Sequence, residues 1–132
     1  MKKTIMIAAI AICSAALFSC KKEKHPVMVN PVAGTKWTGY YRNGSTSPDR
    51  YYMFSFFSQD SILVNANDPN NPSIARGTWK IVSDSIRATY TYTTGDTYSI
   101  IAKNPQTASQ LSGTWGTNLN IDDGGIFLLN KN

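Results

Sequence analysis

Apolar and polar residues alternate with a period of two along most of the chain after residue 33, and this pattern constrains the fold more than any other feature of the sequence. It is clearest in residues 85–93, where one face carries Arg and Thr. The opposite face of that segment carries Ile86, Ala88, Tyr90 and Tyr92. Such alternation is typical of a β-strand with one buried and one solvated face. We therefore expect an all-β domain spanning residues 34–132.

Short stretches rich in Asn, Asp, Gly and Pro separate the alternating segments from one another. These residue types favour turns, because they supply a positive φ, a fixed φ or a side chain that bonds its own backbone. Connectors this short join antiparallel neighbours, since a parallel crossover needs about a dozen residues or more. The expected strands are residues 36–42, 50–57, 61–66, 74–82, 85–93, 97–103, 111–121 and 126–130.

Strands that are each linked to the next by a short turn have two common arrangements. They close into an up-and-down barrel, or they stack as a two-sheet β-sandwich. Closure removes the exposed edge strands that invite aggregation. The sequence therefore predicts a single antiparallel up-and-down β-barrel of about eight strands, with the sandwich as the alternative.

Residues 1–19 have the organisation of a secretory signal peptide. Lys2 and Lys3 precede an apolar run over residues 5–18 that is broken only by Ser14. A helix that spans a membrane needs roughly 20 apolar residues, so this run is too short to be one. The pattern predicts a leader that is removed after export.

The residues at the end of this leader, Leu17-Phe18-Ser19-Cys20, resemble the lipobox of bacterial lipoproteins. The resemblance implies that Cys20 receives a diacylglyceryl group, carries acyl chains such as palmitate and becomes the first mature residue. In that family an aspartate after the cysteine retains the protein in the inner membrane, whereas this chain has Lys21. The resemblance thus implies a lipid anchor in the outer membrane, in either its periplasmic or its surface leaflet.

Residues 20–33 are expected to form the lipidated cysteine and a tether. Pro26 and Pro31 lack an amide donor and hold the residues before them in extended conformations. The segment shows little periodicity and has a basic start. It is therefore predicted to be a semi-rigid spacer between membrane and barrel.

Charge and cysteine content exclude two further possibilities. The formal net charge is +5, but from residue 34 onward eight Lys or Arg residues face seven Asp residues. A nearly neutral domain lacks the basic surface that binding to a phosphate backbone requires, so no nucleic-acid partner is expected. Cys13 leaves with the leader, so Cys20 has no partner for an intramolecular disulfide.

The residues that commonly carry catalysis or hold a metal are almost absent. His25 is the single histidine, and it lies in the tether. The Asp residues of the barrel domain all fall at expected turns, where Asp is favoured for backbone reasons. We therefore predict no catalytic residues, no metal site and no cofactor, and a protein that is not an enzyme.

Three tryptophans lie in similar settings, in the motifs Gly34-Thr35-Lys36-Trp37, Gly77-Thr78-Trp79 and Gly113-Thr114-Trp115. With the lipobox leader and the terminal segment 125–131, the first and third of these motifs resemble the small lipocalin-like lipoproteins of Gram-negative bacteria, in the calycin group of barrels. Lipocalins proper carry Gly-x-Trp, and this chain has one more residue between the glycine and the first tryptophan. The resemblance implies a barrel that binds a ligand.

An aromatic surplus in the barrel domain suggests where such a ligand binds. An interior closed by about eight strands holds side chains or at most one small ligand. We expect a small hydrophobic or amphipathic ligand at an open end, with room left by small residues such as Gly39 and Gly113. The alternative is a solid barrel that serves as a protein-interaction or structural module of the cell envelope, and neither hypothesis fixes an oligomeric state. The expected ligand-binding residues are Trp37, Tyr41, Trp79, Tyr90, Tyr92 and Trp115.

Overall fold

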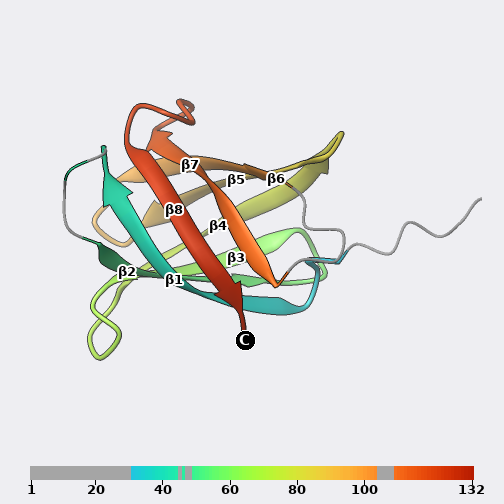
Figure 1. Cartoon of the computed structure of the whole chain (residues 1–132), viewed down its shortest axis with the longest axis horizontal. Coiled ribbons are helices and arrows are strands. Elements are labelled where there is room, and N and C mark those ends of the chain that lie inside the picture. The colour runs from blue at the N-terminus through green and yellow to red at the C-terminus, as the bar shows by residue number, and fades with distance from the viewer. Residues whose placement is uncertain (1–30, 45, 47–48, 104–108) are drawn as a thin grey trace, which may run out of the picture.

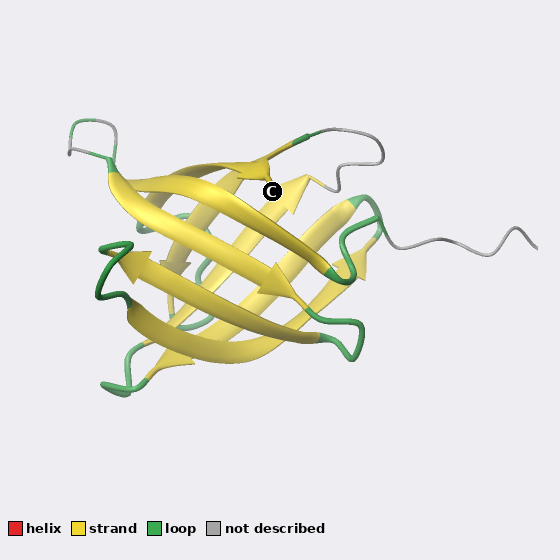
Figure 2. Cartoon of the chain, turned by 90° about the horizontal axis from the view of Figure 1, so that it is seen from below, coloured by secondary structure: helices red, strands yellow, loops and turns green. Residues whose placement is uncertain are grey.

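The computed structural model describes residues 31–44, 46, 49–103 and 109–132, which form a closed eight-stranded antiparallel β-barrel (Figures 1 and 2). Each strand pairs with the next in sequence, and the last pairs with the first. The predicted up-and-down barrel is therefore confirmed, and the two-sheet sandwich is excluded. The strands are β1 (Thr35–Asn43), β2 (Arg50–Phe56), β3 (Ser61–Asn67), β4 (Ser73–Val82), β5 (Ser85–Tyr92), β6 (Thr97–Lys103), β7 (Gln110–Thr117) and β8 (Gly125–Lys131).

The alternation in the sequence becomes the inside and the outside of the barrel. In β5, Ile86, Ala88 and Tyr90 are buried, whereas Arg87 and Thr91 are exposed. Ring contacts between inward side chains fill the middle of the barrel, as between Phe54 and Phe127, whose centroids are 5.4 Å apart. Burial of these side chains supplies the main stabilisation, at about 25 cal/mol per Å² of apolar surface.

Strand β7 is shorter than predicted, because the chain turns at Thr117 instead of continuing to residue 121. The Asp123 carboxylate holds this turn: it accepts hydrogen bonds from the Thr117 amide at 2.7 Å and from the Thr117 hydroxyl at 2.8 Å. These bonds lower the pKa of Asp123. Leu119, which the alternation places on the inward face, is 86% exposed as a result. The predicted strand end at residue 121 was wrong, because the alternation of apolar residues does not show that the Asp123 side chain bonds the backbone of Thr117.

One end of the barrel is sealed by the residues that precede β1. Val32, placed in the tether by the sequence, is fully buried in the core, and its carbonyl accepts a hydrogen bond from the Thr35 amide at 3.1 Å. The barrel domain thus begins at least two residues earlier than residue 34. The predicted signal peptide, the expected lipidation of Cys20 and most of the tether lie outside the described residues.

Three inward-facing glycines mark places where neighbouring strands approach closely. A Cβ added at Gly39 would lie 2.1 Å from the Leu128 carbonyl oxygen, and one at Gly113 would lie 2.1 Å from the Ile101 carbonyl oxygen. Gly77 is in the same situation. The expectation that Gly39 and Gly113 leave room for a ligand is therefore wrong, because the backbone of the next strand fills the space beside them.

Candidate functional site

The end of the barrel opposite Val32 is open and contains a cavity of about 500 Å³. It is bounded by the facing ends of β1 and β2, by the connections β3–β4 and β5–β6 and by the end of β7. Its inner wall is aromatic and its rim is polar. The aromatic lining residues are Tyr41, Tyr52, Tyr90, Tyr92, Tyr98 and Trp115, and the rim includes Asn43, Arg50, Asn67, Ser73, Thr93, Thr94 and Asp96.

Five of the aromatic side chains form a closed ring of contacts around the cavity, each from a different strand. Tyr41 contacts Tyr52 with a centroid separation of 4.9 Å and Trp115 with one of 5.6 Å. Tyr98 lies 5.8 Å from Trp115 and 6.3 Å from Tyr90. A hydrogen bond between the Tyr52 and Tyr90 hydroxyls completes the ring. We call these five residues the aromatic ring, and its edge-to-face, tilted and stacked contacts make a packed wall for the cavity.

The structure brings four of the six predicted ligand-binding residues together in this cavity: Tyr41, Tyr90, Tyr92 and Trp115. The other two, Trp37 and Trp79, do not line it, and the expectation that they share the site does not hold. They are 1% and 2% exposed, and they lie in the core near the sealed end. The Trp79 indole donates to the Phe57 carbonyl there, at 3.1 Å.

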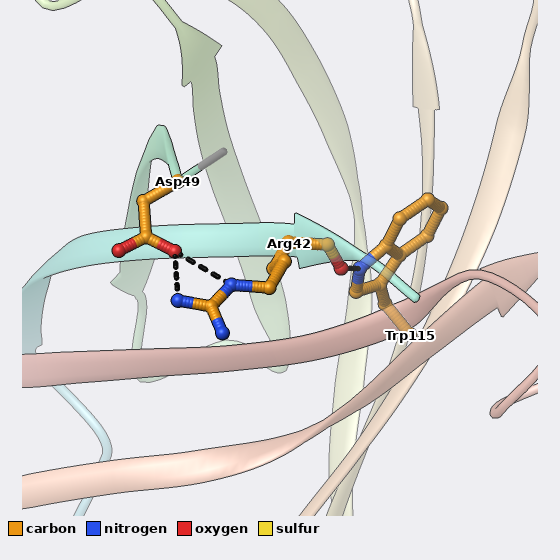
Figure 3. Close-up of polar contacts among 3 residues, drawn as sticks. All are labelled: Arg42, Asp49 and Trp115. Carbon is orange, nitrogen blue, oxygen red and sulfur yellow. Dashed lines mark hydrogen bonds and ion pairs between the residues drawn. The ribbon is translucent and has the colours of Figure 1, made fainter. Parts of the chain in front are cut away.

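Trp115 is held at the mouth by a contact with β1 (Figure 3). Its indole Nε1 donates to the Arg42 carbonyl oxygen at 3.2 Å. The Arg42 side chain forms an ion pair with Asp49, with Nη2 and Oδ1 2.7 Å apart (Figure 3). The indole is thus positioned before any ligand arrives, which reduces the ordering cost of binding.

The floor of the cavity is the pair Tyr52 and Tyr90, which are 3% and 1% exposed. Burial raises the pKa of Tyr52 well above its usual value, and the neighbouring Tyr90 raises it further. Burial also raises the pKa of Tyr90, although the hydrogen bond from Tyr52 partly opposes this. Both phenols stay protonated, so the floor is polar but uncharged. Phe54 lies directly beneath, with its centroid 4.5 Å from that of Tyr52.

The upper wall also disfavours negative charge. Burial raises the pKa of Tyr92, and the nearby Tyr41 and Tyr98 add to the effect. Burial and the Asp96 carboxylate raise the pKa of Tyr98. The cavity wall is therefore a set of neutral rings and hydroxyls.

We expect the buried phenol pair to make the protein unstable at high pH. The folded-state pKa values of Tyr52 and Tyr90 lie above the unfolded value of about 10, so the stabilisation is complete below pH 10 and is lost as pH rises above it. Each phenol that must ionise contributes a slope of about 1.4 kcal/mol per pH unit. Urea unfolding as a function of pH measures this slope, and it should be shallower in Tyr52→Phe. If Tyr52 and Tyr90 gave tyrosinate absorbance near pH 10 in the folded protein, their pKa values would not be raised and the prediction would be contradicted.

Hydrogen bonds tie together one side of the rim. The Tyr41 hydroxyl donates to Asn67 Oδ1 at 2.6 Å, and Asn67 Nδ2 donates to Ser73 Oγ at 2.9 Å. The left-handed backbone of Asn67, with φ of 75°, turns its side chain toward this network. The tyrosine ring and the β3–β4 loop are thereby held in one arrangement.

Sequence reasoning missed several lining residues, notably Tyr52, Tyr98 and Arg50. A usable signal was present, because each lies in phase with the buried residues of its own strand. Tyr98 shares its face with Ile100 in β6, for example. The face of the strand predicts that such residues point inward, and their place near a strand end predicts that they line a mouth.

A scan of protein-family models, a search of curated proteins and a search of solved structures found no match to this chain. Within the described part of the chain, no helix is long and apolar enough to cross a membrane. No three His, Cys, Asp or Glu side chains come together there as candidate metal ligands. The fold and the cavity therefore define the class of protein: an eight-stranded up-and-down barrel with one sealed end and one open, aromatic-lined end.

Proposed function

We propose that the barrel binds a small, partly apolar molecule in the cavity at its open end. The observation that carries this proposal is the cavity of about 500 Å³ enclosed by the aromatic ring. Pockets for small ligands usually measure about 300–1,000 Å³ and combine apolar or aromatic walls with a few polar groups. This cavity matches that description in volume, wall and rim.

The floor of the cavity restricts the ligand to a compact shape. The bonded Tyr52 and Tyr90 hydroxyls cross the barrel, and the buried Phe54 and Phe127 fill the space beneath them. A long acyl chain would have to displace these side chains. A ligand with one or two rings, whose faces lie against Tyr and Trp, fits without such rearrangement.

We further propose that the protein is an exported lipoprotein anchored through Cys20 in the outer membrane. Val32 is buried at the sealed end, so the described chain enters the barrel on the side away from the cavity. Cys20 precedes Val32 by 12 residues, which reach at most about 40 Å when extended. An anchor there would leave the mouth accessible.

Filling the cavity tests ligand binding. Ser73 begins β4, lines the rim and is exposed, so a large side chain at this position can enter the cavity without disturbing the core. We expect Ser73→Trp to abolish the fluorescence enhancement of phenylnaphthylamine, a neutral probe made of a naphthalene and a phenyl group, while the melting temperature changes little. Fluorescence titration with wild-type protein measures the affinity that is lost.

The control places the same bulk outside the barrel. Thr91 is exposed on the outer face of β5, so Thr91→Trp should bind the probe as the wild type does. Equal probe binding by wild type and Ser73→Trp would show that the cavity is not the site.

A second candidate function is the interaction or structural module. The outer face of β1, β7 and β8 carries another hollow, of about 490 Å³, lined in part by Tyr40, Ile126 and Leu128. Tyr40 and Ile126 are 39% and 52% exposed, and such apolar patches often mark interaction sites. This candidate gains support if native mass spectrometry of the protein from its own envelope finds a bound protein and no small molecule.

A further inference from the structure

The rim of the cavity carries a cation that faces inward. Arg50 begins β2, and it lies in phase with the buried Tyr52, Phe54 and Phe56 of the same strand. Its side chain therefore belongs to the inward face of β2. Arg50 is the first residue of that strand, at the open end of the barrel, and it lines the cavity. The guanidinium group is exposed at the mouth instead of being buried in the wall.

This cation has no carboxylate partner among the described residues. Asp49, its neighbour in sequence, pairs with Arg42 on the outer side of β1, where Nη2 and Oδ1 are 2.7 Å apart (Figure 3). That ion pair is the single one in the described part of the chain. The five donors of the Arg50 guanidinium group are thus available for bidentate binding of an acid.

The other charge that lines the mouth lies on the opposite wall. Asp96 directly precedes β6, and β6 lies opposite β2 in the ring of eight strands. Its carboxylate accepts a hydrogen bond from the Thr94 hydroxyl at 2.7 Å. Among the described residues, Asp96 forms no ion pair with Arg50.

The wall below the rim sets the orientation of an anionic ligand. Burial raises the pKa values of Tyr52, Tyr90 and Tyr92, so negative charge is disfavoured at that depth. An acidic group is stable at the rim beside Arg50, and the neutral part of the same molecule is stable among the rings.

We propose that the ligand is a compact amphipathic anion whose acidic group binds Arg50 and whose ring-sized apolar body lies against Tyr41, Tyr98 and Trp115. The acidic group is a carboxylate, sulfonate or phosphate, which share the planar or clustered oxygens that a guanidinium group binds. This inference rests on the proposed function and adds to it the charge and orientation of the ligand.

Two probes that differ by one acidic group test the proposal on the folded barrel. Anilinonaphthalene sulfonate and phenylnaphthylamine share the same ring system, and the first alone carries a sulfonate. We expect Arg50→Gln to lower the affinity for the sulfonate probe about tenfold and to change the affinity for the neutral probe by less than about twofold. The control is Arg87→Gln, which removes an equal charge from the exposed outer face of β5 and should leave both probes unchanged.

The outcomes separate this proposal from the proposed function. If both probes bind, both are blocked by Ser73→Trp, and Arg50→Gln weakens neither or both equally, the assignment of an anion to Arg50 is overturned while ligand binding stands. Loss of sulfonate-probe binding in Asp96→Asn with none in Arg50→Gln would show that Arg50 does not hold the acidic group, and would overturn the proposal. If neither probe binds, or Ser73→Trp leaves both bound, the proposed function itself fails.

Discussion

Replacing Gly77 by alanine is expected to lower the free energy of unfolding by roughly 3 kcal/mol or more. Gly77 faces inward in β4, and the added Cβ would lie 1.9 Å from the Thr89 carbonyl oxygen and 2.5 Å from the Tyr90 Cα. These are backbone atoms of the paired strand β5, so no side chain can rotate away to make room. Relief requires separating two strands of a closed barrel, which breaks their hydrogen bonds.

Thermal and urea unfolding measure this effect. A loss of 3 kcal/mol corresponds to a fall in melting temperature of more than about 10 °C for a domain of this size. The matched control is Thr78→Ala, which introduces the same side chain at the next residue, exposed on the outer face, and should change stability by less than about 1 kcal/mol. Equal stability of the two variants would show that β4 and β5 are not packed as closely as the structure has them.

The fold was predictable from the sequence because the interior of a small barrel imposes a strict period. Inward positions recur at every second residue, so strand positions and their antiparallel order follow from the spacing of apolar residues and turns. Closure into a barrel was favoured over a sandwich by a separate argument, the removal of exposed edge strands. The end of β7 did not follow, because the turn after Thr117 depends on hydrogen bonds from Asp123, six residues further on. Tertiary bonds of this kind leave no trace in local periodicity.

The candidate site was predictable only in part, because the alternation shows which residues face inward but not at which end of the barrel they lie. In an up-and-down barrel, the ends of odd strands and the starts of even strands lie at the same end. Trp115 is near the end of β7 and lies at the mouth, whereas Trp37 is near the start of β1 and lies at the sealed end. Trp79, near the end of β4, joins Trp37 for the same reason. Combining this rule with the predicted strand bounds also selects Arg50 and Tyr98, which are the first residue of β2 and the second residue of β6.

A Cys20→Ser substitution is expected to have the largest effect on where the protein resides. Each buried methylene of an acyl chain contributes about 0.8 kcal/mol, and two or three chains together hold a protein on a membrane durably. Without the thiol no diacylglyceryl group can be attached, so the full-length chain should move from the membrane fraction to the soluble or unprocessed fraction. Fractionation of the envelope, with intact mass of the purified protein, measures both consequences.

The other cysteine supplies the control for this experiment. Cys13→Ser changes the same atom inside the predicted leader and should leave the acyl mass increment and the membrane fraction as in the wild type. Envelope association of Cys20→Ser equal to that of the wild type, or an intact mass without acyl chains, would remove the lipoprotein assignment. Because the chain enters the barrel at the end away from the cavity, the soluble Cys20→Ser form should still bind both probes with wild-type affinity, so that anchoring and ligand binding are tested independently.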